Sequence, residues 1–190
     1  MKQTSIKRRF CSSLLKCFGW KSIGAPIPTP KCIILGAPHT SIWDFVISLL
    51  FYTAVGGKAS VLVKKEFFVW PVKGLMRRLG AIPVDRSKGA SFVKQIVETF
   101  NSHETLHVAI APEGTRNPTS NWKGGFYTIS KAANVPVYFG FFDWGRKEVG
   151  VAEELLLSND QQADIKRVRQ WYNERGVKGK HPKKFITGFE

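Results

Sequence analysis

Hydrophobic positions in this chain occur in short runs and in helical stripes, separated by Gly, Pro, Asn and Asp. Short apolar runs bounded by such residues favour buried strands, whereas apolar residues three and four positions apart favour amphipathic helices. Strands are predicted at residues 32–35, 60–64, 81–84, 106–111, 135–142 and 148–152, and helices at 1–20, 41–54, 70–79, 87–102, 126–133 and 160–174. This alternation predicts an α/β fold with a mixed or largely parallel sheet flanked by helices.

The N-terminal helix is amphipathic, with Ile6, Phe10 and Leu14 along one stripe and basic residues elsewhere. Residues 1–22 contain no acidic residue. A helix packed on the domain fits the apolar stripe, but the absence of acids favours an anionic membrane surface. We therefore predict a basic amphipathic membrane-surface segment at 1–24 and one domain at 25–190, which ends in a basic helix and tail.

Composition supports one folded domain and an anionic partner. The chain has 190 residues, of which 43% are hydrophobic, enough for a single core. Its 29 Lys and Arg against 14 Asp and Glu give a net charge of +15, which attracts nucleic acid, anionic lipid or phosphorylated substrates. No nucleic-acid-binding module is recognisable, so nucleic acid is not expected as a partner.

Cysteine usage and hydropathy bear on location. The three cysteines lack both a disulfide framework and the spacing of a zinc site, which fits a reducing compartment. The longest apolar stretch, at 45–55, is shorter than the roughly 20 residues that a membrane span needs. We expect the protein at the cytoplasmic face of a membrane, attached peripherally or monotopically.

His39 and Asp44 are the first candidates for chemistry. His39 follows a predicted strand and precedes a predicted helix, in the kind of loop where α/β proteins place functional groups. An imidazole there can accept a proton near neutral pH if a partner such as Asp44 orients it. Ser41 and Asp44 also match a helix capping box, and the two roles are compatible.

Two loops that follow predicted strands carry arginines. The first, at 80–87, carries Arg86, and the second, which reads Pro-Glu-Gly-Thr-Arg at 112–116, ends with Arg116. A guanidinium binds phosphate through two parallel hydrogen bonds, and Gly114 permits close backbone approach. A surface turn with a solvated arginine explains either loop alone, but less readily both beside a candidate base.

Taken in order, these motifs resemble the glycerolipid acyltransferases of the lysophosphatidic acid acyltransferase (PlsC-like) family. The resemblance rests on His-x4-Asp at 39–44, the segment ending at Arg86, the Pro-Glu-Gly-Thr-Arg motif at 112–116 and Val-Pro-Val at 135–137. It extends from about residue 32 to residue 142. One departure is Ala111, where the family usually has Phe.

The resemblance implies transfer of a fatty acyl group from acyl-CoA or acyl carrier protein to a lysophospholipid such as 1-acylglycerol 3-phosphate, in phospholipid biosynthesis. It implies His39 as general base, Asp44 as its orienting group, and an acceptor site formed by Arg86, Glu113, Gly114, Thr115 and Arg116. Neither a metal nor a cofactor is expected, because the thioester is a co-substrate. The His-Glu-x-x-His pattern at 103–107 straddles the end of a predicted helix, which disfavours a zinc site.

Two alternatives remain open at this stage. An acyltransferase acting on a lysolipid built on an amino acid would use the same arginines, because a guanidinium binds carboxylate as well as phosphate. A basic lipid-binding or nucleic-acid-binding protein without catalysis would account for the net charge, but not for the motifs. The sequence does not separate the acceptors, the two thioester donors or the acyl chain lengths.

Overall fold

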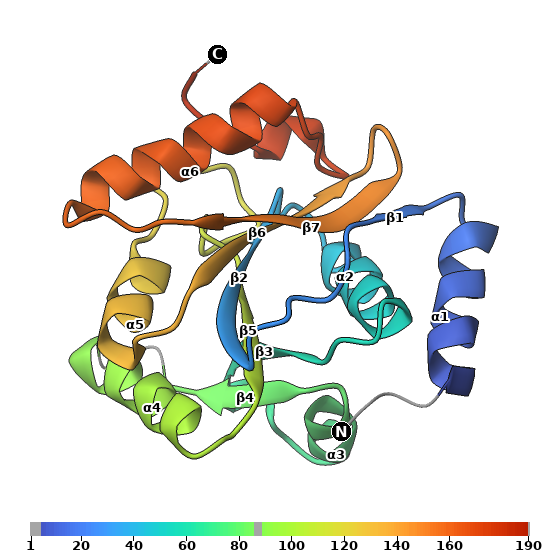
Figure 1. Cartoon of the computed structure of the whole chain (residues 1–190), viewed down its shortest axis with the longest axis horizontal. Coiled ribbons are helices and arrows are strands. Elements are labelled where there is room, and N and C mark those ends of the chain that lie inside the picture. The colour runs from blue at the N-terminus through green and yellow to red at the C-terminus, as the bar shows by residue number, and fades with distance from the viewer. Residues whose placement is uncertain (1–4, 86–88, 190) are drawn as a thin grey trace.

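A twisted seven-stranded sheet forms the centre of the molecule (Figure 1). In the computed structural model, which describes residues 5–85 and 89–189, the strand order is β1-β7-β6-β2-β5-β3-β4. Strands β6, β2, β5, β3 and β4 run parallel to one another. Strand β7 pairs antiparallel with β6, and β1 pairs parallel with β7. The predicted α/β fold with a mixed, largely parallel sheet is confirmed.

The elements follow the predicted order. The strands are β1 Lys21–Ile23, β2 Lys31–Ala37, β3 Ala59–Lys64, β4 Ala81–Val84, β5 Leu106–Ile110, β6 Val137–Asp143 and β7 Glu148–Leu155. The helices are α1 Ser5–Cys17, α2 Trp43–Ala54, α3 Val72–Arg78, α4 Gly89–Asn101, α5 Gly125–Ala133 and α6 Gln161–Arg175, with 3₁₀ helices at Lys65–Phe67 and Pro182–Lys184. Strand β1 was not predicted, because its Lys-Ser-Ile sequence has no apolar pattern.

Helices cover both faces of the sheet. Along β2, Ile33 and Leu35 belong to one hydrophobic cluster, whereas Ile34 belongs to the other, as expected when successive strand residues point to opposite faces. Residues of α4, α5 and α6 complete the first cluster, and residues of α1 and α2 complete the second. Because both faces are buried, functional groups are left to the ends of the strands (Figure 1).

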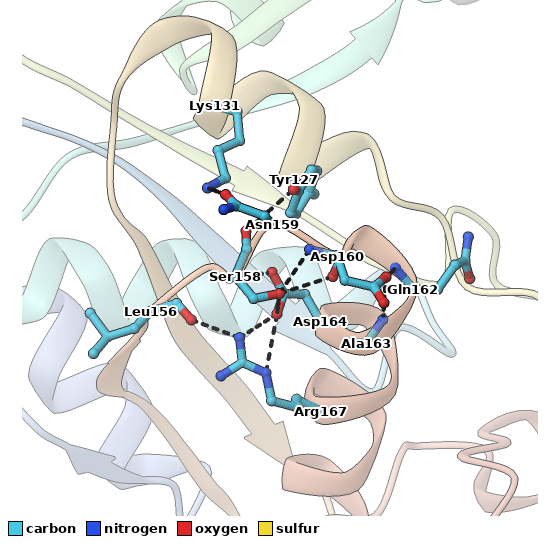
Figure 2. Close-up of polar contacts among 10 residues, drawn as sticks. All are labelled: Tyr127, Lys131, Leu156, Ser158, Asn159, Asp160, Gln162, Ala163, Asp164 and Arg167. Atoms are coloured by element: carbon cyan, nitrogen blue, oxygen red, sulfur yellow. Dashed lines mark hydrogen bonds and ion pairs between the residues drawn. The ribbon is translucent and has the colours of Figure 1, made fainter.

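Helix α6 is fixed at its N-terminus by a polar network (Figure 2). The carboxylate of Asp160 caps the helix, accepting two backbone N–H groups of the first turn at 2.8 and 3.1 Å. Asp164 is fully buried and accepts the Ser158 N–H at 2.8 Å, the Ser158 hydroxyl and the Arg167 guanidinium. The Tyr127 hydroxyl of α5 donates to the Ser158 carbonyl at 3.2 Å, so the network joins α6 to α5.

Helix α1 packs against α2 through one side. Leu15, 1% exposed, lies in the cluster that α2 completes, whereas Ile6 and Phe10 are 80% and 65% exposed. The predicted N-terminal helix is therefore present, with an apolar stripe on its outer side. Across residues 5–85 and 89–189, no helix is both long and apolar enough to cross a bilayer.

Candidate active site

The candidate site lies where the central parallel strands β2 and β5 end. These strands are paired in register, with Leu35 opposite Ile110, so the loops that follow them emerge side by side. One loop carries His39 and the other carries Glu113. The backbone N–H of His39 donates to Oε1 of Glu113 at 2.7 Å, which joins the two loops directly.

Asp44 lies in the first turn of α2 and is completely buried. Its Oδ2 accepts the backbone N–H groups of Thr40 and Ser41, both at 2.7 Å. Its Oδ1 accepts the indole N–H of Trp144, also at 2.7 Å. These N–H donors hold both oxygens of the carboxylate in place.

Asp44 reaches back toward the loop as the capping box predicted. The hydroxyl of Ser41 accepts the backbone N–H of Trp43 at 3.3 Å, although α2 itself begins with Ile42 at the N-cap position and no side-chain cap there. Capping and contact with His39 therefore use the same carboxylate.

His39 faces Asp44 through its Nδ1 atom. This nitrogen lies 3.6 Å from Oδ2 of Asp44, longer than a hydrogen bond, as is common for catalytic pairs without substrate. The His39 side chain is 26% exposed, whereas that of Asp44 is inaccessible. The pair thus combines a solvent-accessible imidazole with a fixed, buried carboxylate.

Glu113 is buried next to the loop that carries His39. Burial raises the pKa of its carboxyl to about 8, against the opposing effect of the His39 N–H. In the part of the chain that the structure describes, its Oε2 atom has no hydrogen-bond partner. A proton on Oε2 leaves Oε1 free to accept from His39, so at neutral pH the protonated acid holds the loop.

The rest of the Pro-Glu-Gly-Thr-Arg loop is more open. Gly114 has φ +68°, and a Cβ there would meet the side chain of Lys123 at 3.0 Å, so the turn requires glycine. The Thr115 hydroxyl accepts the backbone N–H of Asn117 at 3.1 Å. Arg116 is exposed. Arg86, the other predicted arginine of the acceptor site, lies outside the described residues.

Sequence reasoning missed two parts of the site that come from later in the chain. Trp144, which contacts Asp44, is 100 residues away from it in sequence. Residues 176–187, which follow α6, also reach the loop: the backbone N–H of His181 donates to the Thr40 hydroxyl at 3.2 Å. A Cβ on Gly179 would lie 2.7 Å from the side chain of Thr40, which shows how closely the two segments approach.

The histidines of the His-Glu-x-x-His pattern lie elsewhere and apart. His103 is exposed just after α4, whereas His107 is in β5. The ring nitrogens of His107 bond the Tyr52 hydroxyl at 2.6 Å and the Thr29 carbonyl at 2.7 Å. Burial lowers the pKa of His107. Within the described ranges, no group of three or more His, Cys, Asp and Glu side chains is arranged to hold a metal ion.

Comparisons with known proteins agree with this arrangement. The crystal structure of the 1-acyl-sn-glycerophosphate (LPA) acyltransferase PlsC from Thermotoga maritima has a similar fold, with a TM-score of 0.59 and 16% sequence identity over 91% of this chain and 79% of that one. A search of curated proteins found no significant match. The profile of the acyltransferase family matches residues 23–139, which include both His39 and Arg116. The family resemblance read from the motifs is confirmed, and the chain belongs to the acyltransferase family.

Proposed function

We propose that this acyltransferase moves a fatty acyl group from an acyl thioester to the hydroxyl of a lysophospholipid such as 1-acylglycerol 3-phosphate. The observation that carries the proposal is the pairing of an accessible His39 with a fully buried Asp44, 3.6 Å apart, beside the loop that bears Arg116. The similar solved structure is that of an enzyme named for 1-acyl-sn-glycerophosphate, which supports the choice of acceptor.

His39 acts as the general base. With Asp44 opposite Nδ1, the neutral imidazole carries its proton on Nδ1 and leaves Nε2 free. Nε2 takes the proton of the acceptor hydroxyl as that oxygen attacks the thioester carbonyl. The C–S bond then breaks, the proton passes from His39 to the departing thiolate, and the products are an ester and a free thiol.

Asp44 keeps the imidazole in this tautomer and stabilises its charge when it holds the second proton. A carboxylate can do so only if it stays ionised and oriented. Its N–H donors supply both conditions.

Arg116 binds the anionic headgroup of the acceptor. Among the described residues its guanidinium has no ion-pair partner, and it is exposed at the end of the loop that contacts His39. Holding the phosphate there orients the hydroxyl toward the base and converts a bimolecular encounter into an oriented one. Arg86, Gly114 and Thr115 remain predicted members of this acceptor site.

Purified protein with an acyl thioester and a panel of lysolipids tests the proposal. We expect diacyl product, detected by mass spectrometry, with 1-acylglycerol 3-phosphate, and little product with a lysolipid that lacks an anionic headgroup. Product only with a lysolipid built on an amino acid would move the proposal to that acceptor. Salt-sensitive lipid binding without thiol release would contradict catalysis.

We further propose that α1 attaches the protein peripherally to the cytoplasmic face of a membrane. Its exposed Ile6 and Phe10 face away from α2, and Arg8, Arg9 and Lys16 lie on the same helix without an acidic residue. Apolar side chains that enter the headgroup region, flanked by cations, favour anionic lipid.

Flotation with vesicles of anionic phospholipid tests the attachment. We expect the double variant Ile6→Ser, Phe10→Ser to lose most of its binding. Leu156→Ser, which changes a residue that is 72% exposed and outside α1, is the matched control and should bind normally. Equal binding by both variants, or equal binding to neutral vesicles, would contradict the proposal.

A further inference from the structure

The indole N–H of Trp144 donates to Oδ1 of Asp44 at 2.7 Å, on the side of the carboxylate away from His39. Trp144 follows β6 directly, and β6 is the neighbour of β2, the strand that leads to His39. It also lies beyond residues 23–139, the part of the chain that the family profile matches. Trp144 is therefore also outside the four motifs on which the resemblance rests.

The contact completes the set of donors to Asp44. Thr40 and Ser41 hold Oδ2 through their backbone, and Trp144 holds Oδ1. A carboxylate bonded at one oxygen can still rotate about its Cβ–Cγ bond, whereas bonds at both oxygens fix its plane. Without the indole, Oδ1 of a fully buried group would lose its donor, and Oδ2 would no longer be held toward His39.

The surroundings of Trp144 fix the ring and strengthen its N–H as a donor. The ammonium groups of Lys180 and Lys147 lie 4.8 and 5.2 Å from the ring centroid, and Trp20 packs edge-on at 5.0 Å. Cations over a ring withdraw electron density and polarise the indole N–H toward its acceptor. The backbone N–H of Trp144 donates to the Lys178 carbonyl at 2.8 Å, which attaches it to the segment after α6.

We propose that Trp144 is a positioning residue for the transfer reaction, acting through Asp44. It is held in place by residues 176–181, which also contact the His39 loop at Thr40. The inference rests on the proposed role of His39 as base. It adds an element outside the four motifs: the carboxylate of the pair is oriented by a side chain that lies 100 residues away in sequence.

Trp144→Phe tests the inference, because it keeps a ring and removes the N–H. Losing one hydrogen bond to a buried carboxylate should lower kcat about tenfold or more, with KM for both substrates within about twofold. Trp171→Phe likewise keeps a ring and removes an indole N–H, which donates to Glu153 and not to Asp44, and its kcat should stay within about twofold of wild type. A normal kcat in Trp144→Phe, or a loss expressed in KM alone, would overturn the proposal.

A double-mutant cycle separates positioning from general damage. In an Asp44→Asn background, Trp144→Phe should cause no further loss of kcat, because the group through which it acts is already changed. A loss as large as in the wild type would overturn the inference.

The ¹⁵N spectrum of His39 gives a readout that needs no turnover. We expect the Nδ1-protonated tautomer in the wild type and a mixture in Trp144→Phe. An unchanged tautomer would count against Trp144 even if the wild type proved inactive, whereas wild-type inactivity itself would contradict only the proposed function.

Discussion

Asp44 and Asp164 are two fully buried aspartates built in nearly the same way. Each lies in the first turn of a helix, α2 or α6, and each accepts at least one backbone N–H from the segment just before that helix. They differ in the ionisable partner. Asp164 is paired with Arg167, a permanent cation, whereas Asp44 faces His39, which is charged only after it takes a proton.

The difference shows how one local device serves two purposes. The Arg167 pair neutralises Asp164 at all times, and the result is a fixed junction between helices (Figure 2). Asp44 instead accepts N–H groups from Thr40, Ser41 and Trp144, and under the proposed mechanism it stabilises the charge that His39 acquires during the reaction. Replacing each aspartate by its amide separates the two roles.

Asp44→Asn should have the largest effect on activity. The amide cannot stabilise a protonated His39 and can select the wrong tautomer, so we expect kcat to fall roughly 10³-fold, within the range of general-base contributions. The acyl-transfer assay measures the loss, and circular dichroism confirms that the variant is folded. Activity within tenfold of wild type would show that Asp44 only caps α2.

Asp164→Asn should lower the stability of the fold and leave the rate of the reaction unchanged. The amide is a weaker acceptor for the Ser158 and Arg167 donors, and because Arg167 is 47% exposed we expect a loss of about 1.5 kcal/mol in the free energy of unfolding. Urea unfolding measures the loss, and kcat per folded molecule should not change. A large fall in kcat at unchanged stability would contradict the structural role assigned to Asp164.

Glu113 is another buried carboxyl, and its Oε1 accepts the backbone N–H of His39. Its pKa rises from 4.5 to about 8, so between these values the folded protein keeps a proton that the unfolded chain releases. Stability from this group is present below pH 4.5 and is lost as pH rises toward 8, by up to about 1.4 kcal/mol per pH unit.

Glu113→Gln should remove this dependence, because the amide keeps an acceptor for the His39 N–H and does not ionise. Urea unfolding from pH 5 to pH 9 compares the two proteins. We expect the wild type to lose more stability than the variant over this interval. If the free energies of unfolding of the two proteins changed in parallel from pH 5 to pH 9, Glu113 would be ionised throughout this interval.

Arg116 and Arg167 extend the comparison to the cations. The change in acceptor KM on replacing Arg116 is the smallest effect on activity that we expect. Arg167 already has a partner, whereas Arg116 is proposed to find its partner in the acceptor. Arg116→Ala should raise the acceptor KM about tenfold, the value of one charged hydrogen bond, and leave unfolding unchanged. Arg167→Ala should instead lower the free energy of unfolding and leave the acceptor KM unchanged. An unchanged KM in Arg116→Ala would place the headgroup elsewhere.

Local patterns were enough to predict most helices and strands. They also placed the loops that carry His39 and Glu113 at one edge of the sheet. The continuous apolar run of β2 predicts a strand buried on both faces, and the ends of parallel strands bring His39 and Glu113 to the same edge. The direction in which Glu113 points was not predictable, because strand periodicity stops at the loop. Its carboxyl turns inward to the His39 N–H, and its predicted part in binding the acceptor stays a prediction.

Contacts across long stretches of chain were beyond sequence reasoning. Nothing near Trp144 signals that its indole meets Asp44, since the contact depends on β6 pairing with β2. The segment after α6 appears in the sequence only as a basic tail. Its approach to Thr40 follows from the packing of α6 against the core, which is set by tertiary structure.

The most direct test of His39 as the base compares acceptor-dependent thiol release from an acyl thioester by the wild type, His39→Ala and His103→Ala. His103 is an exposed histidine at the far end of β5, so its variant controls for loss of an imidazole. We predict that His39→Ala loses transfer by at least roughly 10²-fold while binding lipid normally, and that His103→Ala matches the wild type. Near-normal turnover in His39→Ala would contradict the assignment of the base.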